Sequence, residues 1–331
     1  PNDHRQYHYL ELANRLRVLL ICDPETDKSA ASLAVNTGHF DDPVDRQGMA
    51  HFLEHMLFLG TRTYPKPGEY QQFMSRHGGS NNAWTGTEFT NFFFDIDNGF
   101  FEAGLDRFSQ FFICPTFAPE WVDKERNAVD SEYRLKLQDD VRRSYQVHKE
   151  TVNPAHPFSK FSVGNLDTLA DLPGRDLRSD LIAFYETHYS ADRMALVMLS
   201  PASIETQLGW CDRFFSTILD RRLGPPALSA PLYRLDDLGI RIQIAPVKET
   251  RKLALTFPLP SVDALYDKKP LTFLSHLIGY EGEGSLLSLL KARGWVNQLA
   301  AGGGISGANF KDFGVSFGLT PLGLAHVDDI I

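Results

Sequence analysis

The chain has 331 residues, of which 43% are hydrophobic, and carries a formal net charge of −9 at pH 7. This length and apolar content suffice for a large buried core and predict two domains. The acidic balance and the lack of a basic run argue against nucleic acid as a partner, and no stretch approaches the length of a membrane span. The three cysteines, Cys22, Cys114 and Cys211, are too few and too scattered for a disulfide framework.

Hydrophobic periodicity along the chain predicts an α+β organisation. We expect strands at residues 17–22, 30–37, 80–85, 89–96 and 195–200. We expect helices at residues 47–59, 68–77, 99–113, from 119 onward, and at 176–188. Gly60 is expected to cap the C-terminal end of the helix at 47–59.

A run rich in proline and small residues, 224–232, has the composition of a linker, so we place a domain boundary there. The expected domains are residues 1–225 and residues 226–331. Beyond the boundary, 240–247 and 253–259 are predicted as paired strands followed by helices, which repeats the order of elements at the start of the chain.

The helix expected at 47–59 contains the segment His51-Phe-Leu-Glu54-His55. In a helix the two imidazoles lie on one face, with Glu54 beside them. This arrangement suits a Zn²⁺ ion bound by two histidines, with a carboxylate close enough to take a proton from metal-bound water. The order H-x-x-E-H is the inverzincin pattern. The flanking residues are apolar, which favours a metal over a surface helix that merely carries two histidines.

A third ligand is expected on the helix that begins at Pro119. Glu125 and Glu132 are seven residues apart and therefore share a face of that helix. Glu132 could bind the metal while Glu125 orients another ligand. The alternative is that both glutamates belong to an ordinary solvated face.

Five segments resemble the inverzincin metallopeptidases, most closely the branch of insulin-degrading enzyme and pitrilysin. These segments are HFLEHMLFLGT (51–61), NAVDSE (127–132), NPAHPFSKF (153–161), GYEGEGSLL (279–287) and GWVN (294–297). The resemblance implies that His51, His55 and Glu132 bind zinc, that Glu54 is the general base and that Glu125 supports catalysis. It also implies two similar domains, each a mainly antiparallel sheet covered by helices on one side.

The same resemblance assigns substrate contacts. The residues it assigns are Asn82, Ala83, Gly279, Glu281, Leu299 and Ala300. The first two lie in a polar strand that could pair with an extended peptide through main-chain hydrogen bonds, and the others would anchor the amino terminus of the substrate. Without the resemblance, an ordinary Asn-rich turn explains Asn82 and Ala83 equally well, and ordinary glycine-containing loops are the favoured explanation for the other four.

The expected function is that of a zinc-dependent endopeptidase that hydrolyses peptides or small proteins within an enclosed chamber. We expect the chain to be the N-terminal part of a longer parent with a truncated second domain, weakly active or inactive without the C-terminal half. A homodimer is a further expected partner, and the compartment stays open between the cytoplasm and the bacterial periplasm. The alternatives are a non-catalytic family subunit that binds peptides or acts structurally, and a peptidase dedicated to processing one precursor.

Overall fold

The computed structural model describes residues 2–331, which form two compact units. The first unit comprises the residues up to Leu137 together with Lys160–Ala227, and the second comprises Gln138–Ser159 and Leu228–Ile331. The chain therefore enters the second unit, returns to the first and then leaves it again. The expected division at residue 225 stays a prediction. It counts residues 138–159 in the first domain, whereas the division into compact units groups them with the second.

The first unit is built on a six-stranded sheet in the order β1-β2-β6-β3-β5-β4. The strands are β1 (Gln6–Glu11), β2 (Arg17–Cys22), β3 (Lys28–Val35), β4 (Ser80–Thr85), β5 (Thr90–Asp97) and β6 (Met194–Ser200). Only β2 and β6 run parallel; the other neighbours are antiparallel. This confirms the mixed α+β class, although the sequence analysis did not identify β1.

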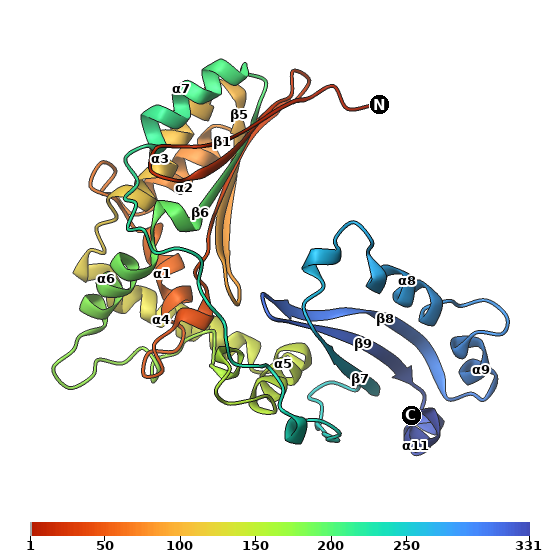
Figure 1. The fold of residues 1–331 in the computed structure, drawn as a ribbon. Coiled ribbons are helices and arrows are strands. Elements are labelled where there is room, and N and C mark those ends of the chain that lie inside the picture. Colours follow the sequence, from red (N-terminus) through yellow and green to blue (C-terminus); the bar gives the residue numbers. More distant parts are fainter. Residues whose placement is uncertain (1) are drawn as a thin grey trace. The chain divides into compact units, whose positions relative to one another are not determined.

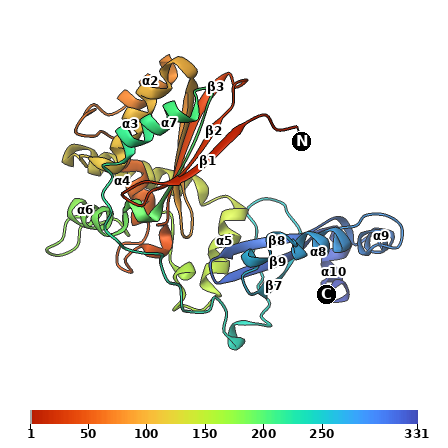
Figure 2. The same ribbon diagram turned by 45° about the horizontal axis from the view of Figure 1, so that its top comes forward.

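Helices cover one face of this sheet (Figures 1 and 2). The helices of the first unit are α1 (Met49–Leu57), α2 (Glu69–Arg76), α3 (Phe101–Ile113), α4 (Pro119–Lys136), α6 (Leu177–His188) and α7 (Ile204–Phe215). Alternate side chains of β5 point into the core, as the two-residue period of a strand requires. Phe94 packs against Phe108 of α3 with ring centroids 5.1 Å apart, and Phe92 packs against Phe112 at 5.4 Å.

The turn after α1 differs from the expectation. The helix ends at Leu57, and its C-cap is Phe58 in right-handed helical geometry, so Gly60 is not the cap. Gly60 instead adopts a φ of +120°, and a Cβ atom there would lie 2.8 Å from the carbonyl oxygen of Pro65. Glycine is needed at this position because two stretches of backbone approach each other closely.

The second unit contains a three-stranded antiparallel sheet in the order β7-β9-β8. Its strands are β7 (Lys252–Leu259), β8 (Val296–Gly307) and β9 (Phe310–Leu319), and its helices are α5 (Asp140–Glu150), α8 (Pro270–Ile278), α9 (Leu286–Ala292), α10 (Pro321–Ala325) and α11 (Val327–Ile330). A small core includes Leu287, Phe313 and Phe317. Helix α8 contributes no buried residue, and Phe273 and Leu277 are 68% and 70% exposed.

The strand expected at 240–247 is wrong. This segment has no regular structure, and Ile240 and Ile242 are 53% and 45% exposed. Its alternating isoleucines fit a strand, but a strand also needs a partner with which to exchange main-chain hydrogen bonds. Within residues 2–331 no helix is both long enough and apolar enough to cross a lipid bilayer.

Candidate metal centre

Helix α1 places the two histidines of the H-x-x-E-H segment side by side. His51 and His55 are four residues apart, so their rings project from the same face one turn apart. The rings are nearly perpendicular, at 86°, with centroids 4.7 Å apart. Their Nε2 atoms lie 3.2 Å from each other.

Helix α4 packs against α1 and brings a carboxylate to the same point. The Oε2 atom of Glu132 lies 3.7 Å from His51 Nε2 and 3.6 Å from His55 Nε2. These three residues are the one group in residues 2–331 whose histidine, cysteine or carboxylate ligand atoms converge in this way.

The spacing of these three atoms fits a zinc ion. A triangle with sides of 3.2, 3.6 and 3.7 Å has a centre about 2.0 Å from each corner, and Zn–N and Zn–O bonds are about 2.0–2.2 Å long. Two imidazoles and one carboxylate form the donor set of many catalytic zinc sites, which keep one position for water.

The outer nitrogen of each imidazole has its own acceptor. The Nδ1 atom of His51 lies 2.6 Å from the carbonyl oxygen of Val163, and Nδ1 of His55 lies 2.6 Å from Oε1 of Glu125. A carbonyl or carboxylate oxygen can only accept, so each Nδ1 carries a proton, and Nε2 is the nitrogen that would bind a metal once it is deprotonated. Glu125 thus contacts the outer nitrogen of His55, and its orienting role stays a prediction.

The charges around these rings favour a cation. Burial lowers the pKa of His51, and neighbouring His55 lowers it further. Burial also lowers the pKa of His55, but Glu125 and Glu132 outweigh burial and raise it to about 9. The interaction with His55 holds the pKa of Glu132 well below its ordinary value, and Lys136, which bonds Oε1 of this carboxylate, contributes. The site thus presents ionised carboxylate to any positive charge placed between the rings.

Glu54 lies on the same helix, with only 8% of its surface exposed. Its Oε2 atom accepts a hydrogen bond of 2.6 Å from the hydroxyl of Thr85, the last residue of β4. Burial raises the pKa of Glu54, which makes this carboxylate a better proton acceptor than an exposed one.

Two contacts at this centre were not predicted from the sequence. Thr85 ends the polar strand that the sequence analysis assigned to peptide binding, and that assignment was the available signal. The contact of Val163 uses its backbone carbonyl, so no residue type marks it in the sequence.

The expected substrate residues divide between the two units. Asn82 and Ala83 lie on β4, which is an edge strand of the six-stranded sheet. In the second unit, the expected residues are Gly279 just after α8, the exposed Glu281, and Leu299 and Ala300 on the edge strand β8. Their roles stay predictions.

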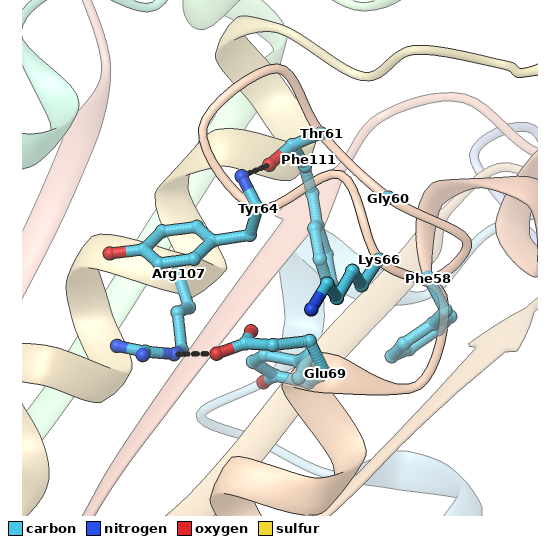
Figure 3. A pocket seen from close by; sticks show the side chains of 9 residues that line it. Phe58, Gly60, Thr61, Tyr64, Lys66, Glu69, Arg107 and Phe111 are labelled. Carbon is cyan, nitrogen blue, oxygen red and sulfur yellow. Dashed lines mark hydrogen bonds and ion pairs between the residues drawn. The ribbon is translucent and has the colours of Figure 1, made fainter.

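A separate small pocket lies beside the C-terminal end of α1 (Figure 3). Arg107 crosses it, donates to Glu69 at 3.0 Å and stacks 4.4 Å from the ring of Tyr64. The lining residues are Phe58, Gly60, Thr61, Tyr64, Lys66, Glu69, Tyr70, Arg107 and Phe111. None of the three converging ligands lines this pocket, so it is distinct from the metal centre.

Comparison with known proteins gives consistent matches along the chain. The model of the family Insulinase (Peptidase family M16) matches residues 17–155, and that of the Peptidase M16 inactive domain matches residues 176–331. Human (Homo sapiens) insulin-degrading enzyme is 45% identical over 334 residues, which cover 100% of this chain and 33% of that protein. The A-factor-processing enzyme of Saccharomyces cerevisiae is 43% identical, over 99% of this chain and 32% of that protein.

The crystal structure of pitrilysin superposes with a TM-score of 0.95 at 33% identity, covering 99% of this chain and 35% of that one. This similarity bears out the predicted fold class. The chain spans about a third of the length of the curated relatives that it matches.

Proposed function

Because the chain belongs to the insulinase family of peptidases, family M16, we propose that it is the zinc-binding part of an endopeptidase that hydrolyses peptides or small proteins. One observation carries this proposal: three ligand atoms from α1 and α4 converge, while separate acceptors turn both Nε2 atoms toward the same point. All four residues of the predicted zinc and base set are present: the ligand atoms of His51, His55 and Glu132 converge, and Glu54 is buried on the helix that carries both histidines. That completeness favours an enzyme over a non-catalytic subunit.

In the proposed mechanism, His51, His55 and Glu132 hold the metal. A bound Zn²⁺ would supply Lewis-acid chemistry and lower the pKa of a water molecule. Glu54 accepts the proton of the attacking water and passes it to the leaving amine. We assign this transfer to Oε1, because Oε2 of Glu54 already accepts from Thr85.

The other protein groups orient these residues. Glu125 keeps the proton of His55 on Nδ1, and the carbonyl of Val163 does the same for His51. Neither imidazole can then turn its N–H toward the metal. This preorganisation lowers the cost of assembling the ligand set when the metal binds.

For substrate binding, we propose that an extended peptide adds to the edge of β4 beside Asn82 and Ala83. Gly279, Leu299 and Ala300 would receive the amino-terminal part of the substrate, and the carboxylate of Glu281 would meet its α-ammonium group. We also propose that the full parent encloses the substrate in a chamber and that a C-terminal half contributes to catalysis. A homodimer and a location in the cytoplasm or periplasm belong to the same proposal.

The first test is metal analysis of the purified chain. We expect one equivalent of zinc, removable by a chelator and absent from the variant His55→Ala. In the full parent protein, Glu54→Gln should keep zinc and lower turnover by about 10²- to 10⁴-fold, the usual contribution of a general base. Wild-type turnover in that variant would exclude Glu54 as the base.

A peptidase dedicated to one precursor is the second candidate, since one relative is named for A-factor processing. A panel of unrelated peptides of increasing length, assayed with the full parent, separates the two. Cleavage of many members supports the general endopeptidase, whereas cleavage of a single sequence supports the processing enzyme.

A further inference from the structure

We propose that residues 160–166, here called the strap, are a positioning element of the metal centre. This proposal rests on the proposed function, because it concerns the same zinc site. The strap has neither helical nor strand structure. It follows directly after residues 138–159, where the chain returns to the first unit.

The strap holds the ring of His51. The carbonyl oxygen of Val163 lies 2.6 Å from Nδ1 of His51, and this contact fixes which nitrogen is left for the metal. Since the acceptor is a backbone atom, the ring is held correctly only if the strap itself lies at a fixed distance from α1.

Two glycines set that distance. Gly48, the N-cap of α1, has a φ of +94° and faces Gly164 of the strap. A Cβ atom on Gly48 would lie 2.3 Å from the Cα of Gly164 and 3.0 Å from the carbonyl carbon of Val163. A side chain at residue 48 would therefore clash with the peptide group whose carbonyl oxygen accepts from His51.

Lys160 ties the strap to the loop that precedes α1. Its Nζ atom donates to the carbonyl oxygens of Phe40 and Asp42, each at 2.6 Å. The carboxylate of Asp42 in turn accepts from the backbone N–H groups of Gly48 and Ala50 at 2.7 and 2.8 Å. Lys160 thus acts on the first turn of the metal helix through Asp42, a residue only 1% exposed.

The strap also contacts the helix of the third ligand. The N–H of Leu166 donates to Oδ1 of Asp130 at 3.1 Å, and the ring of Phe161 meets that of Tyr133 edge to face at 5.4 Å. Asp130 and Tyr133 flank Glu132 on α4. One irregular segment therefore touches both helices that supply ligands, and its displacement would change the spacing of the ligand atoms.

The first experiment compares two glycines with the same local geometry. Gly68 is the N-cap of α2 with a φ of +80°, and a Cβ atom there would meet only Gln72 Nε2, at 4.0 Å. Gly48→Ala and Gly68→Ala thus share the backbone strain of an alanine at positive φ. Only Gly48→Ala also displaces the strap.

The readouts are Zn²⁺ affinity by chelator competition, the absorption spectrum of the Co²⁺-loaded protein, and Tm. We expect Gly48→Ala to weaken Zn²⁺ binding by about tenfold or more and to change the Co²⁺ spectrum, while Gly68→Ala stays within about twofold of wild type.

A second pair of variants keeps the test decisive if Gly48→Ala does not fold. Lys160→Met should weaken Zn²⁺ binding by about tenfold, and Lys160→Arg, which can still donate to two carbonyls, should recover most of the loss. If wild type binds no zinc, the proposed function itself fails. If wild type binds zinc and Lys160→Met lowers Tm without changing affinity or spectrum, the strap is merely structural and the inference is overturned.

Discussion

Replacing Glu125 by glutamine is expected to weaken zinc binding by about tenfold. The carboxylate accepts from Nδ1 of His55 at 2.6 Å, and the two side chains are only 18% and 24% exposed, so water screens this contact little. A hydrogen bond to a charged partner contributes about 1.5–3 kcal/mol and a neutral one about 0.5–1.5 kcal/mol. The difference, about 1–1.5 kcal/mol, corresponds to roughly a tenfold change in affinity. Glu125→Leu should cost more, because it leaves the Nδ1 proton without an acceptor.

The assay is competition with a chromogenic chelator at fixed pH and ionic strength. Glu120→Gln is the matched control, because Glu120 lies exposed in the first turn of the same helix α4. Both variants remove one negative charge from that helix, but only Glu125→Gln alters a contact with His55. If both folded variants bound zinc with the same affinity, the orienting role of Glu125 would be refuted.

Three further outcomes test the structure away from the metal. Burial raises the pKa of Asp312 to about 6, and the folded protein therefore holds this proton more tightly than the unfolded chain does. The resulting stabilisation is complete below about pH 4 and is lost as pH rises to about 6. The Tm advantage of Asp312→Asn over wild type should grow across that interval, since its amide still accepts from Tyr233; a constant difference would contradict the assignment. Cys211 is fully buried, and burial raises its pKa to about 12, so a thiol reagent followed by peptide mass analysis should label the partly exposed Cys114 but not Cys211 until the protein unfolds. Leu277→Lys on the exposed face of α8 should reduce binding of a hydrophobic dye and change the free energy of unfolding by less than about 0.5 kcal/mol; a larger loss would mean that Leu277 is packed.

Much of the candidate metal centre could be predicted from the sequence, because helical geometry sets which side chains share a face on each helix. Once 49–57 is helical, His51 and His55 must share a face, and Glu125 and Glu132 must do so on α4. Both expected helices form, with Pro119 in the first turn of α4. The packing of α1 against α4 is a tertiary property; the shared face of Glu125 and Glu132 suggested it, and the family resemblance favoured it over an ordinary solvated face.

What the sequence did not reveal depends on backbone atoms or on distant partners. The carbonyl of Val163 could belong to any residue type, and the close approach of Gly48 to Gly164 joins residues far apart in the chain. The run at 240–247 shows the reverse case, since its alternation is correct for a strand but no strand among residues 2–331 pairs with it. Local pattern sets the preference of a segment, and tertiary contact decides whether that preference is realised.

The placement of residues 138–159 has a practical consequence for dissecting the protein. Phe158, fully buried, packs near Phe310 of β9, and the N–H of Val247 donates to the carboxylate of Asp140 at the start of α5. A protease that nicks the chain beside Leu235, which is 89% exposed, would separate these contacts in sequence but not in space. The two fragments should therefore co-elute in gel filtration. A protein truncated at the linker, residues 224–232, would lack the strands of the second unit, including β9, whose Phe310 packs near Phe158 just after α5.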